Sequence, residues 1–534
     1  MKFNYKPIAT LSFAATLLVA CGSAADIIST PIENIDSSPL KVTELTAIEK
    51  NNWGHLDLEK DTIPGMAVDR AYSELIKTKK GKKVIVAVID SGIDIDHEDL
   101  DDVIWTNTDE IPNNGKDDDN NGYIDDIHGW NFLGDAYDEQ LEYVRILASG
   151  DTTNPRYAEA KSTYDSEYQL WTGRKTQYDQ IAQVIKSADE SLVKHLGKKD
   201  YTIKEVNAIK TEDQALLQAI QIAQNVNANG ATLAEANTEI NSILVQISER
   251  LNFNLNKSFS GRKTGDDINN ISDTGYGNGN VKPVKKSESH GTHVAGIIAA
   301  ERNNGKGANG VANNVEIMAI RTVPNGDEYD KDVALAIRYA VDNGAKVING
   351  SFGKSFSPHA DWVRDAIKYA SDNDVIFVHA AGNDSKNVDT TPNFPDDNVN
   401  YLEVSNTYIR VGSLAPKYGS KMVSDFSNYG NKNVDVFAPG SEIYSTVPEN
   451  EYEPNSGTSM AAPGVAGIAA LVRSQYPNLT AAQVKQVILE SGLPLTTKVV
   501  VGGDSSNVKP FSELSKSGKI ANAYNALIMA SKLK

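Results

Sequence analysis

Cysteine is nearly absent from this sequence: Cys21 is the only one among 534 residues, so no disulfide can form within the chain. Basic residues are also fewer than acidic ones: 52 Lys and Arg side chains stand against 71 Asp and Glu, which gives a formal net charge of −19 at pH 7. A surface of this sign repels phosphate backbones and anionic headgroups, which argues against nucleic-acid binding and against electrostatic adhesion to a membrane. The composition, 40% hydrophobic and 23% charged, is globular, and the length predicts more than one domain.

Long apolar runs are also missing, apart from residues 8–20. This run follows Lys2 and Lys6, has the length of an export signal, and is too short to span a bilayer comfortably. Residues 18–23 (LVACGS) resemble the cleavage box of bacterial lipoproteins, whose cysteine carries a diacylglycerol group. We therefore expect lipidation at Cys21 and an exported protein of the bacterial cell envelope, anchored to the membrane by lipid. The alternative is an ordinary signal peptide in which Cys21 is one small apolar residue.

Short, β-branched apolar runs recur along the chain and predict buried parallel strands. They lie at residues 84–89, 315–320, 346–348, 375–380, 409–412 and 434–438. Helical patterns separate several of them, for example around residues 333–341 and 362–369. Strands that alternate with helices predict an α/β fold with a doubly wound, mostly parallel sheet, whose sites form at the carboxyl ends of the strands.

The pattern breaks between residues 136 and 271, which are rich in Gln, Asn, Ala, Glu and Lys. Apolar residues there keep helical spacing, as at Ile181, Val184 and Ile185, so we interpret the segment as a helical insertion, either a hairpin or a small bundle. The predicted organisation is a signal peptide (1–20), a tether (21–59), and one α/β domain in two parts (60–135 and 272–534) around the insertion.

Three short segments together carry the groups that serine-based hydrolysis requires. They are VIDSGID at 88–94, HGTHVAG at 290–296 and GTSMAAP at 457–463. A serine needs a base to take its proton, and the base needs a carboxylate that fixes its tautomer and stabilises the imidazolium. Ser459, His290 and Asp90 supply these groups. A position at the start of a helix would also direct backbone N–H groups from Ser459 toward developing negative charge.

These segments, in the order Asp, His, Ser, resemble the subtilisin-like serine proteases, the subtilase family. Chymotrypsin-like enzymes and α/β-hydrolases use other orders, and no G-x-S-x-G elbow is present. The resemblance implies a secreted serine endopeptidase that cleaves protein or peptide substrates through an acyl-enzyme without an organic cofactor. With the box at Cys21, the chain resembles a bacterial lipoprotein member of that family.

Two further segments resemble subtilase motifs. AAGN at 380–383 follows an apolar strand, and the family implies that the Asn383 amide donates to the tetrahedral intermediate; the alternative is a strand-end Asn that favours a turn. VING-SFG at 347–353 resembles the substrate-binding strand, in which Ser351, Phe352 and Gly353 pair with an extended substrate. Gly350 departs from the bulkier residue expected there, which leaves the shape of the neighbouring pocket open.

An acidic loop at residues 117–126 (DDDNNGYIDD) imitates a calcium-binding loop. Its alternating D-x-D-x-N-G spacing turns oxygen ligands inward, and Gly122 permits the sharp turn. The expected ligands of a structural Ca²⁺ are Asp117, Asp119, Asn121, Tyr123 and Asp125. The twelfth position is His128 rather than Glu, so Asp125 or Asp126 must complete the shell. The alternative is a solvated acidic turn.

Two rival hypotheses for the whole chain remain open: a catalytically silent binding protein with the same fold, and a lipoprotein scaffold whose insertion binds a partner. We also expect the insertion to lie beside the cleft and control access or maturation, although a surface decoration is nearly as good an interpretation. His293 lacks the Glu or Cys of a metal pair. We interpret the remaining histidines, among them His97 and His379, as surface or packing residues.

Overall fold

The computed structural model describes residues 29–33, 39–41, 43–400 and 402–533. Cys21 and the predicted export signal lie outside these ranges. Within them, no helix has both the length and the apolarity required to cross a bilayer.

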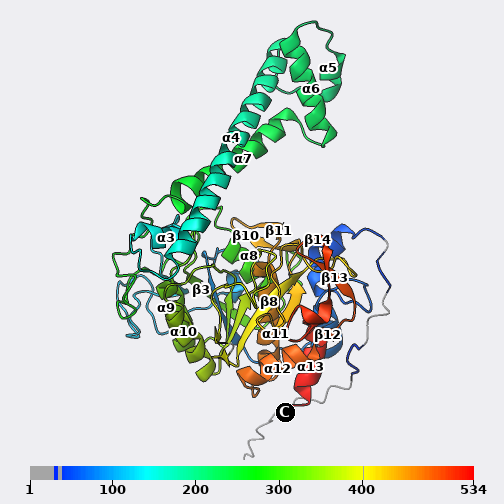
Figure 1. Ribbon diagram of the computed structural model, residues 1–534. Helices are drawn as coiled ribbons and strands as arrows, with labels where there is room; N and C mark the ends of the chain where they lie inside the picture. Colours follow the sequence, from blue (N-terminus) through cyan, green and yellow to red (C-terminus); the bar gives the residue numbers. More distant parts are fainter. Residues whose placement is uncertain (1–28, 34–38, 42, 401, 534) are drawn as a thin grey trace, which may run out of the picture.

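A nine-stranded sheet forms the centre of the globular part (Figure 1). Its spatial order is β12-β15-β9-β8-β5-β4-β1-β3-β2, and every pairing is parallel except that of β12 with β15. The strands are β1 (Val84–Asp90), β2 (Gly129–Asn131), β3 (Val315–Arg321), β4 (Val347–Gly350), β5 (Ile376–Ala380), β8 (Tyr408–Leu414), β9 (Val436–Pro439), β12 (Leu493–Pro494) and β15 (Lys519–Ile520). This confirms the doubly wound, mostly parallel sheet that the apolar runs predict.

Helices cover both faces of the sheet. On one face, α8 (His290–Ala299) and α11 (Thr458–Gln475) pack on β1, β4, β5 and β8, and α12 (Ala481–Ser491) and α13 (Ala523–Ser531) pack on α11. On the other face lie α9 (Asp330–Asp342) and α10 (Ala360–Asp372). Each face has its own buried cluster, so the strands are buried on both sides, as their unbroken apolar runs require.

Three two-stranded hairpins decorate this core and have no counterpart among the predicted strands. They pair β6 (Asn398–Val399) with β7 (Leu402–Glu403), β10 (Ile443–Val447) with β11 (Glu451–Asn455), and β13 (Lys498–Val501) with β14 (Asp504–Pro510). Apart from the valines at 499–501 in β13, their sequences are short and largely polar, so period-2 patterning does not distinguish them from loops.

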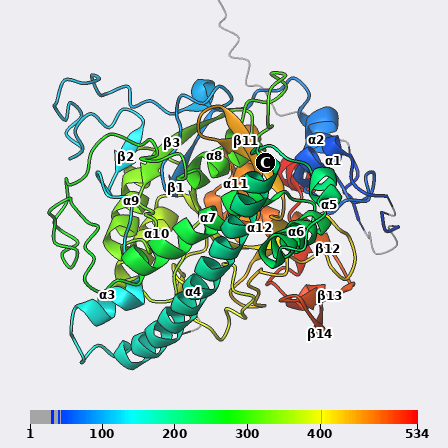
Figure 2. The same ribbon diagram turned by 90° about the horizontal axis from the view of Figure 1, so that it is seen from above.

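The insertion forms a long helical arm (Figure 1). It contains α3 (Glu142–Ala148), α4 (Tyr157–Leu196), α5 (Ile203–Ala208), α6 (Gln214–Ala228) and α7 (Leu233–Glu249). The arm leans across the globular part when seen from above (Figure 2). It has two separate apolar clusters. One, at the tip, joins α4 to α5, α6 and α7; the other, at the base, includes Tyr143, Leu255 and Phe356.

The expected tether of residues 21–59 ends earlier than its composition predicts. Thr46 caps α1 (Ala47–Asn52), and Trp53 and Leu58 are buried in the core of the globular part. The Trp53 indole N–H donates to the Ser441 carbonyl at 3.0 Å. Farther upstream, the Asn525 side chain hydrogen-bonds both the N–H and the carbonyl of Ile32 at 2.8 and 2.9 Å. The large apolar residues of this polar stretch therefore anchor it to the domain.

Candidate active site

Asp90 and His290 meet at the carboxyl end of β1 although 200 residues separate them in the sequence. Asp90 is the last residue of β1, and His290 is the first residue of α8. The Asp90 Oδ1 lies 2.7 Å from His290 Nδ1 and also accepts a hydrogen bond from the Ser91 N–H at 2.8 Å. Because an ionised carboxylate only accepts hydrogen bonds, this contact places the proton on Nδ1 and leaves Nε2 free to accept one.

The close approach of the helix to the strand depends on a glycine. A Cβ at Gly291 would lie 2.3 Å from the Gly92 carbonyl oxygen, so a larger residue would push α8 away from Asp90. Burial lowers the pKa of His290, but the charge and hydrogen bond of Asp90 more than offset this effect and hold it above the usual histidine value.

Ser459 lies in the first turn of α11 and is locked to the end of β4. Its Oγ donates to the Ser351 carbonyl at 3.1 Å, while the Ser351 Oγ donates to the Ser459 carbonyl at 2.8 Å. Asn349 in turn donates to the Ser351 Oγ at 2.9 Å. The serine backbone is therefore fixed, and rotation about one side-chain bond redirects its hydroxyl. In substrate-free enzymes, such a contact tightens toward the base only when substrate binds.

The amide of Asn383 is oriented by the residue before Ser459. Its Oδ1 accepts from both the N–H and the hydroxyl of Thr458, each at 2.9 Å. The Nδ2 lies near Gly457, where an added Cβ would be 3.3 Å from it. The structure thus brings a side-chain N–H donor to the start of α11, where the helix N–H groups also point.

The segment Ser351–Phe352–Gly353 presents alternate peptide groups to opposite sides. Phe352 and Lys354 face the protein: the Phe352 carbonyl lies 2.8 Å from His379 Nε2, and Lys354 forms two backbone hydrogen bonds with Phe394. The N–H and carbonyl of Gly353 have no hydrogen-bond partner among the described residues, and Gly353 is exposed. This is the edge that an added peptide strand requires.

His379 is buried and supports this strand from behind. Its Nδ1 lies 2.9 Å from the Tyr408 hydroxyl, which accepts a hydrogen bond from Arg410 Nε at 3.2 Å. Burial and the neighbouring Arg410 keep the pKa of His379 well below its usual value, so the ring is neutral. Its Nε2–H then donates to the Phe352 carbonyl. The Tyr408 hydroxyl has one proton, and both the Pro395 carbonyl and the His379 Nδ1 lie 2.9 Å from its oxygen as acceptors. Isolated histidines in apolar strands give no sequence signal for such a role.

Arg321 and Glu288 form a second support that sequence patterns do not reveal. Arg321 lies beside Asp90 in the β1–β3 register and is fully buried. Its guanidinium donates to the Ser91 carbonyl at 2.9 Å and to Glu288 at 2.5 Å. The pair therefore fixes the turn after Asp90 and the residue two positions before His290.

Of the ligands expected for calcium in the acidic loop, only one lies in a cluster of carboxylates. Carboxylate oxygens of Asp119, Glu110 and Asp126 lie within 4.8 Å of one another, and both Glu110 and Asp126 are buried. Burial raises the pKa of Asp126, as expected for a carboxyl that lacks a nearby cation. Three hard oxygen ligands of this kind fit a Ca²⁺ ion.

The other expected ligands have different partners. Asp117 accepts from the Asn121 and Gly122 N–H groups, and Asp125 accepts from the N–H groups of Asn114 and Gly115. The Asn121 Oδ1 accepts from the N–H of Tyr123. Of the expected set, the structure thus brings only Asp119 into the carboxylate cluster. Glu110, which lies seven residues before the loop, falls outside the motif.

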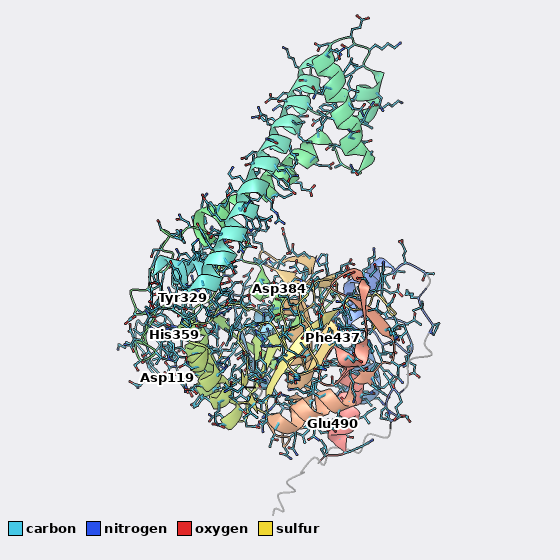
Figure 3. All side chains as sticks on the ribbon, viewed as in Figure 1. Asp119, Tyr329, His359, Asp384, Phe437 and Glu490 are labelled. Atoms are coloured by element: carbon cyan, nitrogen blue, oxygen red, sulfur yellow. The ribbon has the colours of Figure 1, made fainter. Side chains whose placement is uncertain are left out.

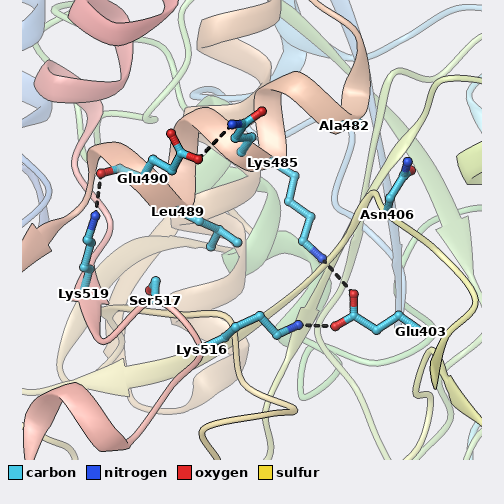
Figure 4. Close-up of a pocket in the computed structure, with 10 residues that line it drawn as sticks. Glu403, Asn406, Ala482, Lys485, Leu489, Glu490, Lys516, Ser517 and Lys519 are labelled. Carbon is cyan, nitrogen blue, oxygen red and sulfur yellow. Dashed lines mark hydrogen bonds and ion pairs between the residues drawn. The ribbon is translucent and has the colours of Figure 1, made fainter. Parts of the chain in front are cut away.

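A separate pocket of about 460 Å³ lies between α12 and the β6–β7 hairpin (Figure 4). Its lysines are already paired with acids or carbonyls: Lys516 with Glu403, and Lys519 with the Glu490 carbonyl. Figure 3 shows Glu490 at the opposite end of the globular part from the arm. None of the predicted site residues lines this pocket.

Comparison with known proteins now defines the class. The sequence pattern of the subtilase family matches residues 81–509, so the chain belongs to the subtilase family and the resemblance of its motifs is confirmed. Among its relatives are a thermophilic serine proteinase of Bacillus sp. (strain AK1), 44% identical over 190 residues, and thermitase of Thermoactinomyces vulgaris, 41% identical over 197 residues. The cell wall-associated protease of Bacillus subtilis (strain 168) is 32% identical over 301 residues.

These alignments cover 35%, 37% and 56% of this chain, respectively. They span 43%, 65% and 30% of the lengths of those relatives.

Proposed function

We propose that this chain is a serine endopeptidase that hydrolyses peptide bonds through an acyl-enzyme, with Asp90, His290 and Ser459 as its catalytic triad. The observation that carries the proposal is the 2.7 Å contact between Asp90 and His290; Ser459 is held at the start of α11, where its hydroxyl donates to the Ser351 carbonyl. Membership of the subtilase family supports the same assignment.

In this proposal the Ser459 Oγ attacks the scissile carbonyl carbon while its proton passes to His290 Nε2. Asp90 holds the Nδ1 proton and stabilises the imidazolium without taking that proton itself. The tetrahedral intermediate then collapses to the acyl-enzyme, and the leaving amine takes the proton from His290. Water repeats the sequence and releases the acid product.

The oxyanion receives hydrogen bonds from Asn383 Nδ2 and from the backbone N–H groups at the start of α11. The substrate lies as an added strand along Ser351–Gly353, with the free peptide groups of Gly353 as partners. Because an extended main chain is the principal ligand, proteins and peptides are the expected substrates.

A fluorophosphonate probe tests the proposal directly. It should label the wild type at Ser459 and fail to label Ser459→Ala, whose circular dichroism should match the wild type. Peptide turnover should fall by about 10⁶ in Ser459→Ala or His290→Ala, because members of a triad act as one unit. The triad assignment would be wrong if either variant kept more than about a hundredth of the wild-type turnover.

A structural Ca²⁺ is part of the proposal. Glu110, Asp119 and Asp126 would hold it, and its charge would offset the three clustered carboxylates. The ion would link the acidic loop to α9, because the Tyr339 hydroxyl donates to Asp126 at 2.6 Å.

We further propose that the protein is an exported lipoprotein of the bacterial cell envelope, anchored through Cys21. The support is the sequence at residues 18–23 and the similarity to a cell wall-associated protease. Labelling with radioactive palmitate should mark the wild type and not Cys21→Ser; equal labelling of both would refute the anchor.

The arm is proposed to restrict access of large substrates to the cleft. Seen from above, the arm projects over the globular part, from which its tip rises well clear in Figure 1, and its root pairs with the loop that follows β3. A deletion that spares the base cluster, described below, distinguishes this role from surface decoration.

A further inference from the structure

A pocket of about 310 Å³ lies directly beside His290 and is more acidic than the reaction itself requires. The substrate-binding segment Ser351–Gly353 forms one side. The other side is formed by residues 323–326, Glu328, Tyr137 and Glu288. Among the described residues that line this pocket there is no Lys or Arg, and His290 is the only basic side chain.

Glu328 is the unusual member of this lining. Its residue is only 2% exposed, and its Oε1 has no hydrogen-bond partner among the described residues. Its backbone carbonyl faces away, toward Lys354 at 2.7 Å and Arg145 at 3.1 Å. Glu328 thus lines the pocket, and the two neighbouring cations form their hydrogen bonds with its backbone carbonyl.

Those neighbouring cations are committed to other carboxylates. Arg145 contacts Glu142 at 2.5 Å, and Lys354 lies 3.0 Å from Glu142 and 2.9 Å from Asp330. With Asp327 and Glu328, four carboxyl groups share two cations. Burial and this excess of acid raise the pKa of Glu328 to about 7 and that of Asp327 above its usual value. With all four carboxyl groups ionised the cluster would lack two positive charges, and the described residues around it do not supply them.

The position of this loop explains how a substrate could supply the charge. Residues 324–328 are paired with the root of the arm: the Asn325 N–H donates to the Tyr137 carbonyl at 2.8 Å, and the Glu139 N–H donates to the Asn325 carbonyl at 3.0 Å. Tyr329 marks the end of this loop at the foot of the arm in Figure 3. The loop is therefore held as a fixed wall that faces the substrate-binding segment.

We infer that this pocket is a specificity subsite that selects peptides with a lysine or arginine side chain, and that Glu328 is the counter-charge for that side chain. The inference rests on the proposed peptidase function and names a substrate class for it. An ammonium or guanidinium group in the pocket would meet a desolvated carboxylate, where charge-assisted hydrogen bonds are strong. Glu288, which also lines the pocket, is already paired with Arg321 and contributes little to this selection.

The selection should depend on pH with a definite sign. A bound cation favours ionised Glu328, so preference for a basic side chain should increase as the pH rises through about 7 and fade below it. Asp327, Asp330, Glu142, Arg145 and Lys354 are the other charged groups around this carboxyl. Burial and neighbouring acids also leave Asp327 with a raised pKa, so its ionisation acts in the same direction.

A positional-scanning set of internally quenched peptides tests the inference. Each of the four positions before the cleaved bond carries lysine, arginine or norleucine in turn. At pH 8 the wild type should prefer a basic residue at one position by about tenfold or more, the usual strength of a charged hydrogen bond. In Glu328→Gln the basic-to-norleucine ratio at that position should fall to near one. Glu449→Gln, which removes an exposed acid elsewhere, should keep the wild-type ratio.

Absence of any basic preference in the wild type, or an unchanged ratio in Glu328→Gln, would overturn the inference. If Glu328→Gln does not fold, the wild type alone decides, because its ratio must increase between pH 6 and pH 8. A flat ratio overturns the role of Glu328. If the wild type cleaves no peptide, the proposed function fails separately; calorimetric binding of lysine and norleucine peptides to Ser459→Ala then decides the subsite without turnover.

Discussion

Replacing His379 by alanine tests how the substrate-binding segment is held. The imidazole donates to the Phe352 carbonyl at 2.8 Å, between the two residues that are expected to pair with substrate. Removal of the ring leaves a buried carbonyl without its partner, which costs about 1–3 kcal/mol of stability. The cavity left by the ring adds to this loss.

The kinetic consequence follows from the freedom that Phe352 gains. If its peptide group is no longer fixed, the substrate must order it, and fixing one residue costs about 1–2 kcal/mol. That free energy corresponds to an increase in KM of about 5- to 30-fold for a peptide that pairs with the segment. The increase should be the same at pH 6 and pH 8, because His379 is neutral throughout that range.

Two substrates and one control variant make the assay specific. A peptide of six or more residues should show the KM increase, whereas a small nitrophenyl ester, which does not reach the segment, should not. His379→Gln retains a side-chain N–H and should recover most of the peptide KM. His97 is equally buried, and its Nε2 lies 3.2 Å from the Glu451 carbonyl, so His97→Ala controls for a cavity remote from the segment.

The reasoning fails if His379→Ala slows ester and peptide hydrolysis equally, because the defect then lies in the triad or in the fraction of folded protein. It also fails if glutamine is no better than alanine, since the N–H donor is then irrelevant. A KM increase in His97→Ala of the same size would show that loss of stability alone explains the effect.

Other predictions address the remaining parts of the site. Asn383→Ala should lower kcat by about 10²–10³ with little change in KM, because the Asn383 N–H forms a good hydrogen bond only with the oxyanion of the transition state. A higher KM with unchanged kcat would mean that Asn383 binds the ground-state substrate instead. Only neutral His290 can accept the serine proton, so kcat/KM should increase with pH to a midpoint above the ordinary histidine value of about 6.5; a midpoint below that value would contradict the influence of the buried carboxylate. Chelation should lower Tm and Ca²⁺ should restore it, by about 2.7 kcal/mol of stability at a hundredfold excess over Kd. Asp126→Asn should abolish that calcium-dependent shift, whereas Asp125→Asn should keep it; the reverse would favour the alternating ligand pattern. Replacement of residues 176–245 by a short Gly/Ser linker removes the tip of the arm but spares the base cluster, and it should accelerate cleavage of a folded protein far more than that of a short peptide. Equal acceleration of both would show that the arm does not restrict the cleft.

The sheet was predictable because its strands are buried on both faces. Continuous β-branched runs such as residues 84–89 have no other stable environment, and the structure places them within a residue or two of the predicted bounds. The polar hairpins lack such a signal. The arm was predictable in kind from the helical spacing of Ile181, Val184 and Ile185, but its 40-residue α4 and its separate tip cluster depend on contacts between distant segments.

The candidate catalytic residues follow from short motifs because each motif ends or begins a regular element. A strand end at Asp90 and a helix start at His290 fix side-chain direction, so local sequence is informative. The groups behind them are different. Arg321, Glu288 and His379 act through neighbours 27 to 230 residues away, and nothing in their immediate sequence specifies those partners.

The calcium loop shows the same division. Alternation includes Asp119, which lies in the carboxylate cluster, whereas Asp117 and Asp125 lie outside that cluster and accept hydrogen bonds from backbone N–H groups of the turns. The positive φ of Asp125 redirects the chain immediately before Asp126, which points inward to Tyr339. Side-chain direction in a loop depends on each backbone torsion, so a spacing rule derived from one loop geometry does not transfer to another.

The arm is inserted between two residues of one triad, and the geometry of its root explains why the site tolerates this. Asn254, near the end of the insertion, donates to the carbonyls of Glu139 and Asn325, at 2.9 and 2.8 Å. One side chain therefore ties both ends of the insertion to the loop after β3. Other contacts also join the base of the arm to the globular part: Arg145 donates to the Glu328 carbonyl, and Arg156 donates to the Ser355 carbonyl. These contacts and the Asn254 joint all lie at the loop after β3 or just beyond the substrate-binding segment, so motion of the long helices would reach the cleft at those two segments.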